Sequence, residues 1–264
     1  MNWSPLQIRE IFHLEFLREL AVKIPSSSFI LKGGSNLRFF FGSNRYSEDM
    51  DLDAEGLPVD ALCEKVMAIL RSKTLANRLR TFGIGKIIPP NLVSAKQTET
   101  VQRFKIHLLT AAEEDLFTKV EFSRRGLDSP AAPETVDASV TARYLIPPLI
   151  VPHYLAEAAI KQKIRALVSR THTQARDIFD LYILSSRIPP ESKPDAAGLG
   201  KKDLIEARRR IYEIDYDRFR DTVVAYLDAE DQKRYTETAG WDEIRLTAAS
   251  LIEGVAGHER EDDD

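Results

Sequence analysis

The sequence predicts an α+β fold, with a mixed sheet in the first half and an all-helical second half. Residues 47–53 alternate strictly between their two faces, which predicts a strand. Further strand patterns occur at 100–109 and 116–123, joined by an acidic turn at 113–115. From about residue 150 almost to the end, apolar residues recur at helical spacing.

The remaining elements follow from local patterns. Residues 1–24 are expected to form an amphipathic helix that Ser4 caps and in which Pro5 occupies the first turn. Breaking residues from Pro25 onward end this helix, and a short buried strand is expected at 29–31. Helices are then expected at 36–41, 59–75, 153–170, 174–186, 201–212, 215–228 and 240–255.

The domain organisation is predicted from composition along the chain. Gly, Ser, Pro and Ala residues gather in 126–139, which is typical of a linker. We therefore expect one domain at 1–128 and a second at 140–258. Residues 259–264 hold five acids and one base and are expected to form a solvated tail.

The overall composition is that of an ordinary globular protein, with 43% hydrophobic and 30% charged residues. No apolar run approaches the ~20 residues of a membrane helix, and the N-terminus lacks a signal-peptide pattern. Cys63 is the only cysteine, which excludes internal disulfides and cysteine-rich metal sites. We expect a cytoplasmic protein without a membrane partner.

The charge is distributed unevenly. The formal net charge of −4 resides in the tail, because the rest of the chain has 36 acids and 36 bases. Within that neutral remainder, residues 71–125 hold eleven bases and five acids, and residues 161–176 hold five bases and no acid. Such stretches can contact the phosphates of a nucleic acid, although they are equally typical of solvated faces.

The strand at 47–53 carries a row of carboxylates. Ser47, Asp49, Asp51 and Asp53 share one face, because side chains alternate along a strand. Carboxylates ~7 Å apart repel one another unless a cation lies between them, and no basic residue lies between Tyr46 and Lys65. Mg²⁺ (or Mn²⁺) would suit oxygen ligands and leave positions for phosphate oxygens. The alternative is an exposed edge strand with solvated acids.

A glycine turn precedes these carboxylates. The expected strand at 29–31 runs into Lys32, Gly33, Gly34 and Ser35, and then into a helix. Two glycines let backbone N–H groups approach a phosphate closely, and a helix N-terminus attracts an anion. An ordinary strand–turn–helix corner has the same pattern. A phosphate-binding turn followed by a carboxylate strand is more specific than either part alone.

Residues 32–38 and 45–51 together resemble the signature of the AbiEii/AbiGii toxin family of nucleotidyltransferases, which are of the DNA polymerase β type. Thirteen residues separate Ser35 from Asp49, a spacing that fits this family, which usually has Thr in place of Ser35. The resemblance implies a nucleotidyltransferase core at 1–128 and a helical domain that contributes to the active site. The residues expected to bind the nucleoside triphosphate are Lys32, Gly33, Gly34, Ser35, Arg45 and Ser47.

A third carboxylate is expected because a two-metal transfer site usually takes one from a neighbouring strand. Glu121 is the predicted third ligand, since it lies on the polar face of the strand at 116–123. A surface glutamate is the alternative, and the acidic turn at 113–115 is a weaker rival.

Residues 161–182 resemble the second conserved block of the same family. At ~100° per residue, Lys163 lies near the middle of an apolar arc, whereas Lys161 lies at its polar edge. A buried lysine needs a partner or a bound anion, unless its side chain reaches back to solvent. In the next helix, Asp177 is the expected inward partner of Lys163, and Asp180 is expected on the polar side in a structural pair.

The resemblance implies a magnesium-dependent nucleotidyltransferase that is the toxin of a toxin–antitoxin or phage-defence system. It would transfer a nucleoside monophosphate from the triphosphate to RNA, at the 3′ end of tRNA, and a cognate antitoxin would be its other partner. The expected catalytic residues are Asp49, Asp51, Glu121, Lys163 and Asp177, and the first three are the expected metal ligands. Two alternatives stay open: a transferase of the same fold acting on a protein or small molecule, and a non-catalytic binding module.

Overall fold

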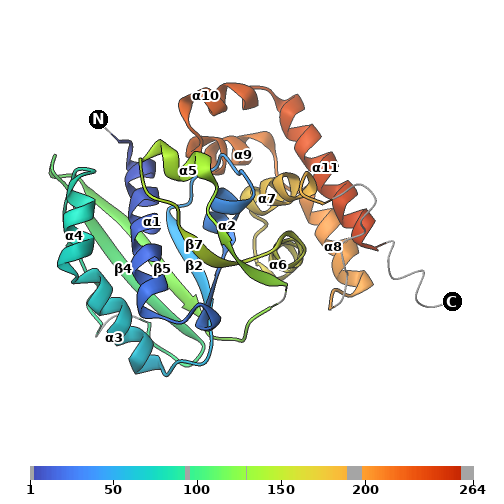
Figure 1. Cartoon of the computed structure of the whole chain (residues 1–264). Helices are drawn as coiled ribbons and strands as arrows, with labels where there is room; N and C mark the ends of the chain where they lie inside the picture. Colours follow the sequence, from blue (N-terminus) through green and yellow to red (C-terminus); the bar gives the residue numbers. More distant parts are fainter. Residues whose placement is uncertain (1–2, 93–95, 129, 189–197, 257–264) are drawn as a thin grey trace. The chain divides into compact units, whose positions relative to one another are not determined.

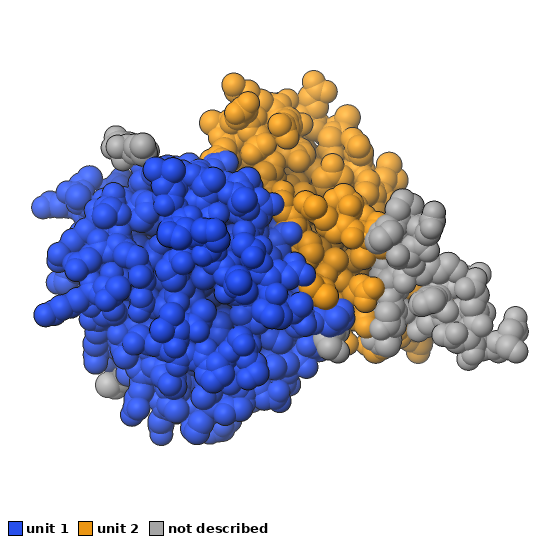
Figure 2. Space-filling model, viewed as in Figure 1, with its two compact units in different colours: residues 1–40, 46–154 blue, residues 41–45, 155–264 orange. Residues whose placement is uncertain are grey.

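The computed structural model describes residues 3–92, 96–128, 130–188 and 198–256. The chain divides into two compact units, shown in blue and orange in Figure 2. Unit 1 comprises residues 1–40 and 46–154, and unit 2 comprises residues 41–45 and 155–264. The first unit contains a sheet and the second is helical, so the predicted α+β class is confirmed.

Unit 1 is built on a mixed sheet, which within the described residues has seven strands in the order β3-β4-β5-β2-β1-β7-β6. Strand β2 pairs antiparallel with β1 and parallel with β5. The strands are β1 (Phe29–Lys32), β2 (Asp49–Ala54), β3 (Ile84–Ile88), β4 (Val101–Thr110), β5 (Asp115–Ser123), β6 (Ala131–Thr135) and β7 (Ile150–Tyr154). The predicted strands at 29–31, 47–53, 100–109 and 116–123 are therefore found within one or two residues.

The helices of unit 1 are α1 (Pro5–Lys23), α2 (Gly33–Phe40), α3 (Val59–Leu70), α4 (Lys73–Arg80) and α5 (Ala138–Arg143). Ser4 caps α1 as predicted, and its hydroxyl accepts a hydrogen bond from the N–H of Gln7. The single helix expected at 59–75 is wrong. It divides because the Ser72 side chain accepts from the N–H of Leu75 and starts a new helix there.

The core of unit 1 lies between the sheet and the layer of α1, α3 and α4 (Figure 1). Alternate residues of β4 and β5, such as Phe104 and Val120, are fully buried and belong to this core together with Phe12 of α1. The intervening residues of the same strands point to the opposite face of the sheet. That opposite face carries Arg103 of β4 and Lys119 and Glu121 of β5.

The predicted linker at 126–139 is wrong, because it contains β6 and the first residues of α5. Strand β6 is a short edge strand that holds Pro133 and pairs antiparallel with β7. Proline is tolerated at such an edge, which explains why its local pattern resembles a loop. The sheet therefore extends to Tyr154, and the compact unit ends later than the expected domain boundary.

Unit 2 consists of helices, which begin at Ala156 rather than at residue 153. They are α6 (Ala156–Ser169), α7 (Ala175–Ser185), α8 (Lys201–Ile211), α9 (Tyr216–Thr222), α10 (Ala229–Gln232) and α11 (Thr238–Ala256). The Phe219 and Trp241 rings stack in its core at 4.3 Å between centroids. The helix expected at 215–228 is interrupted after Thr222, and the expected acidic tail at 259–264 lies outside the described residues.

Residues 41–45 belong to unit 2 although they precede β2 in sequence. The guanidinium of Arg187 donates two hydrogen bonds to the carbonyl of Phe41, at 3.1 and 2.8 Å. Along the described part of the chain, we find no helix with the length and apolar character needed to cross a membrane.

Candidate active site

The register of the sheet brings the predicted carboxylates together. Asp49 lies opposite Lys119 of β5, and Asp51 lies opposite Glu121. Residues paired across neighbouring strands point to the same face. Asp49, Asp51 and Glu121 therefore share the face of the sheet that α1, α3 and α4 leave uncovered.

Two cations from neighbouring strands contact these carboxylates. The Lys119 Nζ lies 3.0 Å from Asp49 Oδ2 and 3.9 Å from Glu121 Oε2. Arg103 Nε donates to Glu121 Oε2 at 2.6 Å. The sequence predicted a strand without nearby positive charge. The structure corrects this, because β4 and β5 supply the charge from the side.

Asp51 and Gly33 approach each other closely. Gly33 has a φ of +69°, and a Cβ added there would come within 3.0 Å of Asp51 Oδ2. Only glycine adopts this conformation without strain and also leaves room for the carboxylate. Burial raises the pKa of Asp51, and the nearby Lys119 ammonium opposes that shift.

Two predicted serines fix the start of β2. Ser35 Oγ donates to the carbonyl oxygen of Asp49 at 3.2 Å, and Ser47 Oγ donates to the same oxygen at 2.7 Å. Gly33, Gly34 and Ser35 form the first turn of α2. The first N–H groups of a helix have no partner inside the helix, so they are available to a phosphate.

Lys32 takes part in a separate, more buried group. Its ammonium forms an ion pair with Asp53, which also accepts a hydrogen bond from the Tyr154 hydroxyl at 2.7 Å. Asp53 is buried, so it does not extend the carboxylate row that the alternation predicted. Its role is to hold the ends of β1, β2 and β7 together.

The donor set fits a hard divalent cation. Asp49 and Asp51 offer oxygen atoms on one face, and a cation would offset the burial that raises the pKa of Asp51. Within the described residues, Asp49, Asp51 and Glu121 do not form a three-ligand group close enough to hold a metal. Lys119 and Arg103 contact two of the three carboxylates in that arrangement.

The remaining predicted residues form a buried ionic cluster in unit 2. Lys163 Nζ lies 2.6 Å from Asp180 Oδ2 and 3.3 Å from Asp177 Oδ1. Arg45 Nη2 lies 3.4 Å from Asp180 Oδ1, and Arg170 Nε lies 3.1 Å from Asp177 Oδ2. The expected contact of Lys163 with Asp177 is thus present.

The expectation that Asp180 lies on the polar side is wrong. Asp180 is fully buried because α7 packs against α6, α9 and α11, so that most of its circumference is covered. Burial alone would raise the pKa of Asp180, but Lys163 and Arg45 hold it below its ordinary value. Burial lowers the pKa of Lys163, and the two aspartates more than reverse that effect. Lys163 and Asp180 are therefore both charged at neutral pH.

The predicted site residues fall into two groups, one in each unit. Sequence reasoning missed Lys119, Arg103 and Asp180 as partners of these residues. The sequence does indicate that Lys119 shares a face of β5 with Glu121, because the two are two residues apart. Its contact with Asp49, however, depends on the register between β2 and β5, which the sequence does not give. Arg38, the last residue of the first motif block, is buried, and its Nε donates to Glu10 Oε2 at 2.7 Å.

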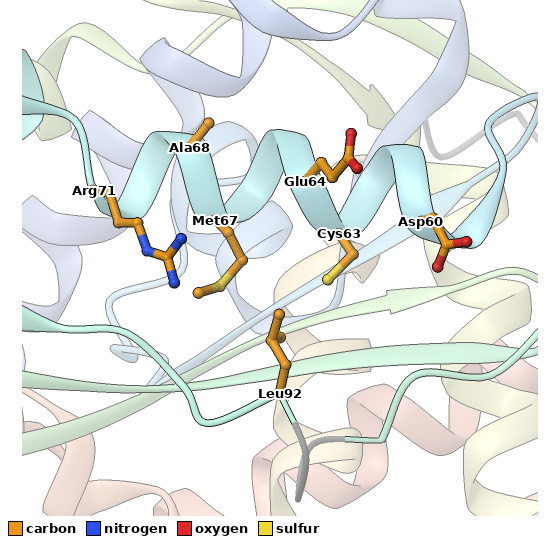
Figure 3. Close-up of a pocket in the computed structure, with 7 residues that line it drawn as sticks. All are labelled: Asp60, Cys63, Glu64, Met67, Ala68, Arg71 and Leu92. Carbon is orange, nitrogen blue, oxygen red and sulfur yellow. The ribbon is translucent and has the colours of Figure 1, made fainter.

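An open pocket lies beside α3 (Figure 3), with a volume of about 430 Å³. It is lined by Asp60, Cys63, Glu64, Met67, Ala68, Arg71 and Leu92. Burial and the two nearby carboxylates raise the pKa of the Cys63 thiol, which disfavours the nucleophilic thiolate. Because α3 covers the other face of the sheet, this pocket is separate from the carboxylates of β2.

Comparison with known families decides the identity of the fold. Residues 15–245 match the family described as nucleotidyl transferase AbiEii toxin, type IV toxin–antitoxin system. The chain belongs to this family. It is a nucleotidyltransferase and the toxin component of a type IV toxin–antitoxin system, as the motifs around Ser35, Asp49 and Lys163 predicted.

Solved structures share the AbiEii fold at low sequence identity. JHP933 from Helicobacter pylori aligns over 100% of this chain and 97% of its own, with a TM-score of 0.55 and 18% identity. A putative nucleotidyltransferase from H. pylori aligns over 96% of this chain and 95% of its own, with a TM-score of 0.53 and 20% identity. MenT4, a nucleotidyltransferase toxin from Mycobacterium tuberculosis, aligns over 94% of this chain and 84% of its own, with a TM-score of 0.59 and 16% identity. No curated protein matches the sequence.

Proposed function

We propose that this AbiEii-family chain transfers a nucleoside monophosphate from a nucleoside triphosphate to RNA, at the 3′ end of tRNA. The observation that carries the proposal is the approach of the Gly33 turn to Asp51, on the face that Asp49 shares. It puts a helix N-terminus suited to phosphate beside carboxylates suited to a metal.

Asp49 and Asp51 would hold Mg²⁺ or Mn²⁺, which supplies positive charge to the triphosphate when bound. Ser35 and Ser47 keep Asp49 in place through its carbonyl oxygen. The N–H groups of the first turn of α2, from Gly33 onward, hold phosphate oxygens.

The transfer breaks the bond between the α- and β-phosphates and releases pyrophosphate. An RNA hydroxyl attacks the α-phosphorus, and Glu121 accepts the proton of that hydroxyl. Arg103 orients the Glu121 carboxylate through its 2.6 Å hydrogen bond. Lys119 compensates the carboxylate charge until the substrate arrives.

The helical half contributes Lys163 and Asp177 to the proposed site. Lys163 neutralises phosphate charge, and Asp177 orients the Lys163 side chain. Their buried pairing supports a structural duty as well. Lys163→Arg separates the two roles, because it keeps the charge inside the cluster. Transfer lost from a stably folded variant supports a direct role of the Lys163 ammonium, whereas retained transfer shows that a positive charge alone suffices at this position.

The RNA acceptor is supported by the excess of bases over acids in residues 71–125. As the toxin of a type IV system, the protein would act in the cytoplasm, where triphosphates, RNA and a cognate antitoxin meet.

The test incubates the purified full chain with each α-labelled triphosphate, total tRNA and either Mg²⁺ or EDTA. We expect label on tRNA with one or more triphosphates, only with the metal, and none with Asp49→Asn. Label on a protein or small molecule instead of RNA would replace RNA as the acceptor class. Full growth inhibition by Asp49→Asn would support the non-catalytic alternative.

A further inference from the structure

The face of the sheet opposite α1, α3 and α4 carries a second feature next to the carboxylates. Six of the side chains that β3, β4 and β5 place on this face are basic or aromatic. We call this surface the cationic face, and its residues are Lys86, Arg103, Lys105, His107, Phe117 and Lys119.

The cationic face is continuous with the carboxylates through the sheet register. Lys105 of β4 lies opposite Lys119 of β5, which in turn lies opposite Asp49 of β2. Neighbouring strands are ~4.8 Å apart, so the Lys105 backbone lies about 10 Å from that of Asp49. One step further along the strands, His107 lies opposite Phe117.

The charge of this face is positive in excess. Its acids are already engaged, since Glu121 pairs with Arg103 and Asp115 pairs with His107. Lys86 and Lys105 are exposed, and neither forms an ion pair with another residue that the structure describes. These two lysines are therefore available to the phosphates of a ligand.

An exposed aromatic pair adds a stacking surface. The His107 and Phe117 rings lie 5.6 Å apart at an interplanar angle of 72°. Phe117 is 40% exposed, a large fraction for an aromatic side chain. Its backbone is rigidly placed, because its carbonyl accepts a 2.7 Å hydrogen bond from Arg9 Nε. An exposed ring on a rigid strand can stack on a nucleic-acid base of any identity.

We propose that the cationic face binds the single-stranded end of an RNA, with Lys86 and Lys105 on its phosphates and Phe117 and His107 against its bases. Charge alone would also suit an acidic peptide, but exposed rings among free cations are typical of single-stranded nucleic-acid binding. That the 3′ end of the bound RNA points toward Asp49 rests on the proposed function, whereas the binding of RNA to the cationic face does not.

The test measures binding of a fluorescent 12-nucleotide RNA and of labelled tRNA to the full chain without triphosphate. Lys86→Gln/Lys105→Gln is compared with Lys23→Gln/Lys73→Gln, which removes the same charge from exposed positions on α1 and α4. We expect at least a ~10-fold higher Kd for the first pair only. The slope of log K against log salt should fall by about 1.4, at ~0.7 for each lost phosphate contact.

Phe117→Ala should weaken binding at least ~5-fold at unchanged salt slope, because it removes stacking and no charge. Phe117→Leu keeps an apolar side chain without an aromatic face and should weaken binding similarly. Circular dichroism and Tm establish that each variant is folded.

Equal Kd values for wild type and the Lys86/Lys105 variant would overturn the proposal. Competition by poly-glutamate as strong as by RNA, with no effect of Phe117→Ala, would assign the face to an acidic polypeptide instead. If the wild type binds RNA here but labels none, the proposed function fails and this inference stands. If transfer to RNA continues with an unchanged KM for RNA in the lysine variant, the inference fails and the function stands.

Discussion

Asp49 of β2 and the aspartates of the cluster around Lys163 illustrate two different environments for a paired carboxylate. In unit 1 the Asp49 and Lys119 side chains are 38% and 23% exposed, and each contacts a partner that solvent can replace. In unit 2 the Asp180 side chain is fully buried and Lys163 is 12% exposed. The first arrangement can exchange a partner for a ligand, whereas the second is closed by its own ion pairs.

The difference in burial predicts a difference in what each group contributes. An exposed ion pair adds little to stability, because water screens it. A buried charge that loses its partner is strongly destabilising. We therefore expect changes at Asp49 to affect activity far more than folding, and changes at Asp180 to affect folding first.

The largest effect is expected for Asp180→Ala, which leaves Lys163 and Arg45 buried without this partner. The free energy of unfolding should fall by about 3–5 kcal/mol. The chain has two tryptophans, Trp3 in unit 1 and Trp241 in unit 2, so fluorescence in a Trp3→Phe background follows the second unit during urea unfolding.

The matched control is Asp217→Ala, because Asp217 makes an exposed pair with Arg220 in the same unit. It should change the free energy of unfolding by less than about 1 kcal/mol. If Asp180→Ala lowered the free energy of unfolding by no more than this control, the buried cluster around Lys163 would not be important for the stability of unit 2.

Asp49→Asn should reduce nucleotide transfer by about 10²–10³-fold or more, because it removes a charge from the position that stabilises the triphosphate. Its urea midpoint should stay close to that of the wild type, since the pair with Lys119 is partly exposed. Initial rates at saturating triphosphate and RNA measure the first effect. A large loss of stability with proportionate loss of rate would contradict the contrast between the units.

Acid should weaken the protein through His13 of α1, which is fully buried and has its pKa lowered to about 3 by burial and by Arg9. The unfolded chain takes up this proton below about pH 6.5 while the folded one does not, so acid favours unfolding. Between pH 7.5 and pH 5, His13 should cost about 2 kcal/mol of stability.

Urea unfolding at both pH values measures this effect, and His13→Gln should remove about 2 kcal/mol of the difference. The Asp180 pKa is lowered, so its stabilisation is present at both pH values and disappears only as the pH falls through that lowered pKa. An unchanged pH dependence in His13→Gln would show that another group is responsible.

Gly33→Ala should reduce transfer about 10-fold and lower the free energy of unfolding by about 1–2 kcal/mol. The strain comes from its φ of +69°, and the effect on transfer comes from contact of the new methyl group with Asp51. Gly83→Ala is the control, because Gly83 has a φ of +84° and a Cβ there would meet nothing within 4 Å. It should lose similar stability and keep its transfer rate.

The sequence allowed the chemistry-bearing elements to be predicted because their patterns are local. Alternation placed Asp49 and Asp51 on one face, and helical spacing placed Lys163 inward. The partners could not be predicted in the same way. The contact of Lys119 with Asp49 depends on parallel pairing of strands that lie some seventy residues apart, which no local pattern encodes.

The elements that were missed have weak intrinsic signals. Strand β3 is short and contains Gly85, β6 contains Pro133, and β7 contains Pro152. These strands exist because neighbouring strands pair with them, as β6 and β7 pair with each other. Asp180 was misplaced for a similar reason, since a helical wheel assumes one buried side and α7 has neighbours on several.

The allocation of residues 41–45 to unit 2 constrains how the molecule could be recombined with its relatives. The chain passes between its units at residues 40/41, 45/46 and 154/155, so the helical unit is not a continuous C-terminal block. A chimera joined only at residue 154 would combine its helices with a foreign loop and lose the native match between Arg45 and Asp180. Exchange of the helical unit with that of a relative would therefore require two exchanged segments, one of them only five residues long.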